Sequence, residues 1–78
     1  MAVGLGRDMS VALFNASLDG PYFASRGDTT LTGEITFDFG ELTFYPRSWA
    51  VPTDVAVAGL RSFATSGMQP VEIDWERL

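Results

Sequence analysis

The residues in this sequence that could carry out chemistry are almost all carboxylates. Glu72, Asp74 and Glu76 occupy alternate positions near the end of the chain, so they would project from one side of an extended strand. Such a group could supply the acid and base of glycoside hydrolysis or bind a hard cation. The sequence has no histidine, cysteine or lysine, which removes the usual general base and the thiol and amine nucleophiles. A charged outer face is also ordinary for a one-sided sheet, so we predict no catalytic site, no metal site and no cofactor.

The carboxylates belong to a predicted strand at the end of the chain. Val71, Ile73 and Trp75 alternate with them and would form the apolar face of this strand. The pattern therefore predicts a half-buried strand over residues 71–76 with one fully acidic face.

A helix is predicted just before this strand, from an apolar stripe at helical spacing formed by Val55, Ala56, Gly59, Leu60 and Phe63. Its start has two interpretations. Either Thr53 is the N-cap, or Pro52 occupies the first helical position with Asp54 in the first turn. Gly67, followed by Pro70, predicts its end. Gly59 costs about 1 kcal/mol relative to alanine inside a helix, so we expect close packing against a strand there.

The upstream chain is predicted to form the sheet that this helix covers. Short apolar or alternating runs predict strands at residues 10–15, 22–25, 34–38 and 41–45. Residues 1–9 show no period and are expected to be a flexible segment before a single domain over residues 10–78. The predicted fold class is α+β, with an antiparallel meander of about four strands, one helix packed on one face and a C-terminal strand.

The two central strands give the strongest hairpin pattern. A two-residue turn at 39–40 would pair Phe37 with Leu42 and Ile35 with Phe44, which puts the apolar side chains on one face. The same register sets Asp38 opposite Glu41, and like charges there are mildly unfavourable. A longer or bulged turn is therefore the alternative. The aromatic residues predicted to lie in the core are Phe37, Phe44, Phe63 and Trp75.

The composition is that of a small acidic protein. The chain has 78 residues and a net charge of −5, which disfavours direct binding of nucleic acid through phosphates and suits a basic partner. Plain solubility is the other explanation of such a charge. No apolar run approaches the length of a membrane span, and residues 1–9 are too short and polar for a signal peptide. We therefore expect no membrane partner and a cytoplasmic protein.

The stretch from Tyr45 onward resembles the end of bacterial immunity proteins of immunity protein family 1. The shared pattern is a Val-Pro pair and an acid before an alanine-rich helix, followed by a phenylalanine, a glycine stop, a proline and a tryptophan strand. The matching residues are Ser48, Val51, Pro52, Asp54, Ala56, Phe63, Thr65, Gly67, Pro70, Ile73 and Trp75. Residues 19–23 and 25–28 are also similar to segments of the family, so the resemblance covers residues 10–78.

The resemblance implies a bacterial antitoxin that binds the C-terminal domain of a polymorphic toxin, often a nucleic-acid deaminase, and blocks its active site or substrate groove. An acidic surface could occupy the basic channel of such an enzyme. The predicted partner-binding residues, with Trp49 as an aromatic anchor, are Glu34, Asp38, Glu41, Trp49, Glu72, Asp74 and Glu76. The alternative is a small acidic structural module that self-associates through a sheet edge. Strand order and oligomeric state are left open.

Overall fold

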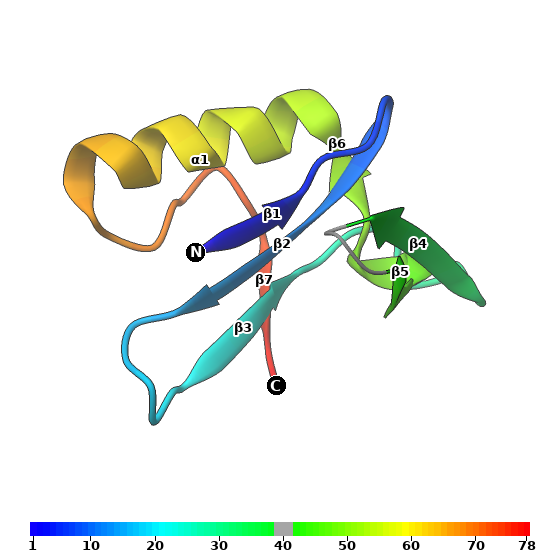
Figure 1. Ribbon diagram of the computed structural model, residues 1–78, viewed down its shortest axis with the longest axis horizontal. Helices are drawn as coiled ribbons and strands as arrows, with labels where there is room; N and C mark the ends of the chain where they lie inside the picture. Colours follow the sequence, from blue (N-terminus) through cyan, green and yellow to red (C-terminus); the bar gives the residue numbers. More distant parts are fainter. Residues whose placement is uncertain (39–41) are drawn as a thin grey trace.

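The computed structural model describes residues 1–38 and 42–78, and it has the predicted α+β class. The larger antiparallel sheet has the strand order β1-β2-β3-β7, and the short β6 pairs with the start of β2. Its strands are β1 (Ala2–Gly4), β2 (Met9–Asn15), β3 (Tyr22–Ser25), β6 (Val51–Pro52) and β7 (Trp75–Arg77). The helix α1 (Thr53–Ser66) lies across one face of this sheet (Figure 1).

The two central strands form a sheet of their own. They are β4 (Glu34–Asp38) and β5 (Leu42–Pro46), and they pair with each other as a separate hairpin. The strands therefore divide into two sheets, whereas the sequence suggested one continuous meander. A short 3-10 helix, η1 (Arg47–Trp49), leads from the hairpin into β6.

The first residues of the chain take part in the larger sheet. Residues 1–9 were expected to be a flexible segment, yet Ala2–Gly4 forms β1 and pairs with β2, with Val3 opposite Ala12. β1 is therefore the edge strand of the larger sheet, next to β2.

The helix begins and ends close to the predicted positions. Pro52 occupies the N-cap position without a side-chain cap, so neither predicted start is correct in detail. The Thr53 hydroxyl instead donates a hydrogen bond to the carbonyl oxygen of Gly6 at 3.0 Å, which fastens the helix start to the loop after β1. At the other end Gly67 has φ 70°, and its N–H donates to the Phe63 carbonyl, as the predicted left-handed stop requires.

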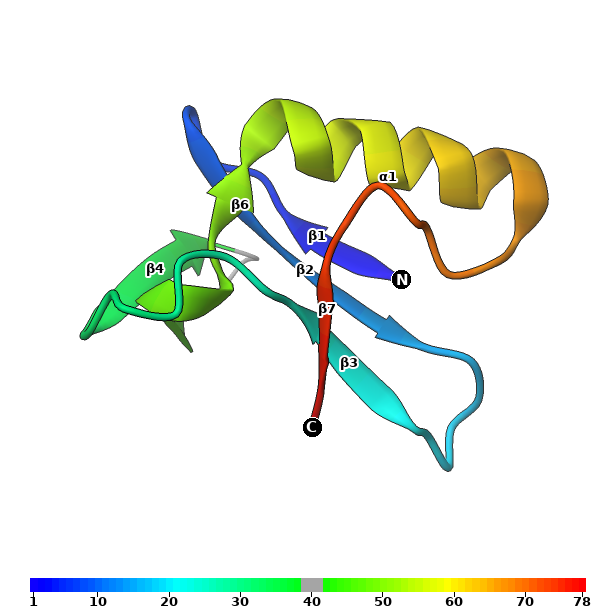
Figure 2. The same ribbon diagram turned by 180° about the vertical axis from the view of Figure 1, so that it is seen from behind.

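Gly59 is a site of close packing, but its neighbour is a loop residue and not a strand residue. A Cβ atom at this position would lie 2.4 Å from Cδ1 of Ile73, which is buried in the segment between Pro70 and β7. This segment passes back along α1 before it reaches the sheet (Figure 2). The absence of a side chain at Gly59 therefore lets the C-terminal segment approach the helix.

An aromatic cluster joins the helix, the sheet and the C-terminal strand. The ring of Phe14 on β2 contacts Phe63 of α1 edge-on at 5.9 Å between centroids, and it contacts Trp75 of β7 at 6.0 Å. The Trp75 indole N–H donates to the Pro70 carbonyl oxygen at 2.8 Å. Phe63 and Trp75 thus pack between α1 and the larger sheet, as predicted for core residues, although both are partly exposed.

The hairpin register differs by one residue from the first prediction. Phe37 lies opposite Thr43, Ile35 opposite Tyr45 and Asp38 opposite Leu42. The predicted pairing of Phe37 with Leu42 and of Ile35 with Phe44 is therefore wrong, and the turn residues 39–41 lie outside the described part of the chain. A shift of one residue moves every side chain of one strand to the other face.

Candidate partner-binding site

The three C-terminal acids do not share the face of one strand. β7 contains Glu76, whereas Glu72 lies in a turn and Asp74 lies just before the strand. Val71, which was predicted to be on the apolar face, is 93% exposed. The predicted strand is shorter because Ile73 packs on α1, so the preceding residues leave the plane of the sheet. Glu72, Asp74 and Glu76 are all solvent-exposed.

Arginines lie close to two of these acids. The backbone N–H of Arg26 donates to the Asp74 carbonyl oxygen at 2.7 Å, which places the two residues side by side. Arg61 of α1 lines the same shallow hollow as Glu72. The C-terminal segment is therefore a region of mixed charge and not the fully acidic face that the alternation predicted.

Trp49 joins the hairpin to the larger sheet. Its ring lies 5.9 Å from the ring of Tyr45 on β5, and Tyr45 lies 6.4 Å from Phe37 on β4. The Ser25 hydroxyl of β3 donates to the Trp49 carbonyl oxygen at 2.6 Å. Trp49 is half-buried, and its ring is in contact with that of Tyr45. Its role as an anchor for the partner stays a prediction.

The acids of the hairpin are separated along its length. Glu34 is exposed at the start of β4, where it lies opposite Pro46. Asp38 is at the other end of β4 and pairs through its backbone with Leu42, while its side chain lies outside the described part of the structure. Glu41 also lies outside the described residues. Of the three predicted hairpin contacts, the structure thus places the side chain of Glu34.

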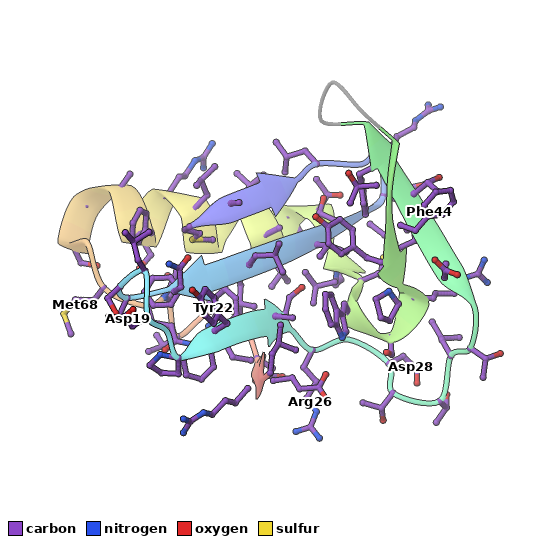
Figure 3. All side chains as sticks on the ribbon, turned by 60° about the horizontal axis from the view of Figure 1, so that its bottom comes forward. Asp19, Tyr22, Arg26, Asp28, Phe44 and Met68 are labelled. Atoms are coloured by element: carbon purple, nitrogen blue, oxygen red, sulfur yellow. The ribbon has the colours of Figure 1, made fainter. Side chains whose placement is uncertain are left out.

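Phe44 is an exposed aromatic residue that sequence reasoning assigned to the core. It is 61% exposed and lies opposite Thr36 in the middle of the hairpin. Figure 3 shows its side chain on the side of the hairpin directed away from the larger sheet. The prediction of Phe44 as a core residue is wrong because the register places Tyr45, and not Phe44, on the face that packs against Trp49.

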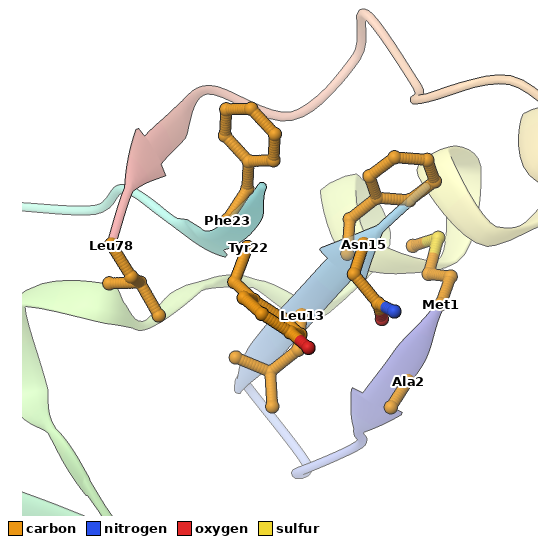
Figure 4. A pocket seen from close by; sticks show the side chains of 8 residues that line it. Met1, Ala2, Leu13, Asn15, Tyr22, Phe23 and Leu78 are labelled. Atoms are coloured by element: carbon orange, nitrogen blue, oxygen red, sulfur yellow. The ribbon is translucent and has the colours of Figure 1, made fainter. Parts of the chain in front are cut away.

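An apolar hollow on the larger sheet also escaped the sequence analysis. It has a volume of about 380 Å³, and its lining includes Leu13, Tyr22 and Leu78 (Figure 4). Strand alternation could have identified Leu13 and Tyr22. The contribution of Leu78 could not be foreseen, because it depends on the pairing of β7 with β3.

The described residues offer little for metal or acid-base chemistry. Among residues 1–38 and 42–78, no group of three or more acidic, histidine or cysteine side chains could hold a metal ion. The pKa of Asp28 is lowered because its carboxylate accepts hydrogen bonds from the Thr30 hydroxyl at 2.6 Å and from the Thr30 N–H at 3.0 Å. This arrangement organises a turn. No helix in the described part of the chain is long and apolar enough to cross a membrane.

The architecture and the exposed side chains are those of a small acidic α+β protein with aromatic and carboxylate groups available at its surface. The family model of Immunity protein Imm1 matches residues 1–77, and the chain belongs to this family. Membership implies a cognate toxin as the partner. Searches of the curated proteins and of the solved structures found no match.

Proposed function

We propose that this protein binds a cognate bacterial toxin domain that acts on nucleic acid, such as a deaminase, and neutralises it by blocking its active site or substrate groove. The observation that carries the proposal is the match of the Imm1 family model to residues 1–77. That match covers β1 and β7 together with everything between them, so it applies to the folded domain as a whole.

The charge of the chain supports a basic partner surface. The protein has ten acidic residues, five arginines and no histidine. An enzyme that acts on DNA or RNA needs positive charge along its substrate channel, because phosphate contacts supply much of the affinity for nucleic acid. An acidic inhibitor is attracted to that channel and competes with the substrate for the same charges.

The structure leaves most predicted contact residues accessible. Glu34, Glu72, Asp74 and Glu76 are exposed to solvent. Reversing Glu72 and Asp74 to lysine tests whether the C-terminal segment takes part in the contact, because association with the toxin domain should slow if it does.

Co-expression with the toxin domain encoded beside this gene is the direct test. Cells that produce the toxin domain alone should stop growing, and cells that also produce this protein should grow. With purified components, a stoichiometric complex should form, and deamination of a cytosine- or adenine-containing oligonucleotide should stop. Growth arrest despite abundant folded immunity protein would refute the proposal. Inhibition of a toxin with a different activity would retain neutralisation and refute the deaminase assignment.

A further inference from the structure

The outer face of the β4–β5 hairpin is an exposed surface with an aromatic residue at its centre. Phe44 lies between Thr36 on the paired strand and the exposed Pro46 on its own strand, and Glu34 lies opposite Pro46. All of these side chains are exposed, although phenylalanine is normally among the buried residue types. An exposed aromatic side chain is suited to anchor a partner, because aromatic residues are enriched in the buried core of protein–protein interfaces.

The inner face of the hairpin explains why Phe44 stays outside. Phe37 is 8% exposed, and Tyr45 contacts both Phe37 and Trp49 through its ring. Because alternate residues of a strand face opposite sides, Phe44 can turn inward only if Tyr45 leaves its contacts. Internal packing therefore holds the outer face in position, and a pre-organised surface loses less entropy when a partner binds.

The charged groups near this face have both signs, within a chain that is acidic as a whole. Glu34 is exposed on the face itself. Arg47 follows β5 at the same end of the hairpin, where its backbone N–H donates to the Gly33 carbonyl oxygen at 3.0 Å. Because the protein has ten acidic residues and five arginines, its net charge attracts a basic partner, and the apolar side chain of Phe44 is complementary to an apolar pocket on that partner.

We propose that this outer face, formed by Glu34, Thr36, Phe44 and Pro46, is the surface through which the protein docks on its toxin, with Phe44 in an apolar pocket and Glu34 against arginine or lysine side chains at the pocket's border. The inference rests on the proposed function, because it takes the toxin domain as the occupant. It assigns the main contact to Phe44, which family membership does not specify, and it makes the C-terminal acids secondary.

The chain offers matched controls for both parts of the surface. Leu78 is 60% exposed, close to the exposure of Phe44, and lines the separate hollow on the larger sheet. Asp19 is an exposed acid like Glu34 but lies in the turn between β2 and β3. The four variants are therefore Phe44→Ser, Leu78→Ser, Glu34→Arg and Asp19→Arg. A thermal melt of each should give the wild-type Tm, because each substituted side chain is exposed.

The experiment measures binding of each variant to the purified, catalytically inactivated toxin domain encoded beside the gene. Phe44→Ser should weaken binding about 30-fold or more, as expected for a central aromatic contact, while Leu78→Ser binds like the wild type. Glu34→Arg should slow association about tenfold at low salt, with a smaller difference at high salt. Asp19→Arg should have a much smaller effect.

The outcomes separate this inference from the proposed function. If the wild type does not bind the toxin domain, the proposed function fails and the docking surface fails with it. If the wild type binds tightly, but Phe44→Ser and Glu34→Arg bind equally well, neutralisation stands and the hairpin assignment is overturned. If instead Phe44→Ser converts a wild-type dimer into a monomer without changing toxin affinity, the face is an interface between two copies of this chain, and the inference is also overturned.

Discussion

The contact between Gly59 and Ile73 provides the clearest test of how the C-terminal segment packs on α1. In Gly59→Ala, the new Cβ atom would lie 2.4 Å from Cδ1 and 2.9 Å from Cγ1 of Ile73. Ile73 is 2% exposed, and Cβ of Pro70 lies 3.5 Å from the same position. The isoleucine therefore has little space into which it can turn, and we expect the substitution to overpack this interface.

Two opposing effects determine the magnitude for Gly59→Ala. Overpacking a well-packed interior costs about 1–3 kcal/mol. Alanine in place of glycine within a helix returns about 1 kcal/mol. The expected result is a net loss of about 1 kcal/mol in the free energy of unfolding, measured by urea denaturation followed by tryptophan fluorescence and circular dichroism. Ala58→Gly on the exposed side of α1 measures the propensity effect alone and should also destabilise by about 1 kcal/mol.

A double-mutant cycle identifies Ile73 as the cause. Ile73→Val removes Cδ1 and should cost about 0.5–1.5 kcal/mol by itself. Combined with Gly59→Ala, it should be less destabilising than the sum of the two single substitutions by about 1 kcal/mol, because the new methyl group fills the vacated space. The reasoning is refuted if Gly59→Ala stabilises the protein by as much as Ala58→Gly destabilises it, since position 59 would then behave as an open helical site.

Three further predictions concern hydrogen bonds. Trp75→Phe keeps an aromatic ring at this position but removes the indole N–H that donates a hydrogen bond to the Pro70 carbonyl oxygen. The free energy of unfolding, measured by urea titration, should therefore fall by about 1–2 kcal/mol. Ser25→Ala removes a fully buried hydroxyl that bonds to two main-chain groups; it should cost about 1–3 kcal/mol for each group left unpaired, and an unchanged Tm would contradict this. Thr30→Val should raise the pKa of Asp28 toward its ordinary value in an NMR titration. Because the folded-state pKa of Asp28 is lowered, its contribution to stability is present above the unfolded-state pKa and is lost as pH falls through the folded-state pKa, and that pH dependence should weaken in the variant.

The helix was predictable because its signals are local. The apolar stripe, the glycine stop at Gly67 and the following proline act within a few residues of where they occur, and the structure confirms the helix to within a residue at each end. The pairing of Phe14 with Phe63 and Trp75 is different. It depends on β1, β2, β3 and β7 taking a particular order, and a single sequence contains no local signal for that order.

The hairpin register shows how a small error in the fold becomes a large one at the candidate site. In the predicted register Ile35 pairs with Phe44 and Phe37 with Leu42. In the register shifted by one residue, Ile35 pairs with Tyr45 and Phe37 with Thr43. Hydrophobicity alone favours the first arrangement. The structure has the second, because the ring of Tyr45 finds a partner outside the hairpin. This contact lies outside the hairpin and leaves no local pattern in the sequence, which is why Phe44 was predicted to lie in the core.

The positions of the C-terminal acids also depend on a contact between segments that are distant in the sequence. The alternation over residues 71–76 predicted a strand. Because Gly59 has no side chain, Ile73 can pack directly on α1, and this contact determines where the neighbouring Glu72 and Asp74 lie. Gly59→Ala, which must displace Ile73, should also displace these two acids while leaving the hairpin unchanged. If the hairpin is the docking surface, folded Gly59→Ala protein should bind the toxin domain with wild-type affinity in a calorimetric titration. A large loss of affinity in protein that is still folded would instead place the main contact on the C-terminal segment.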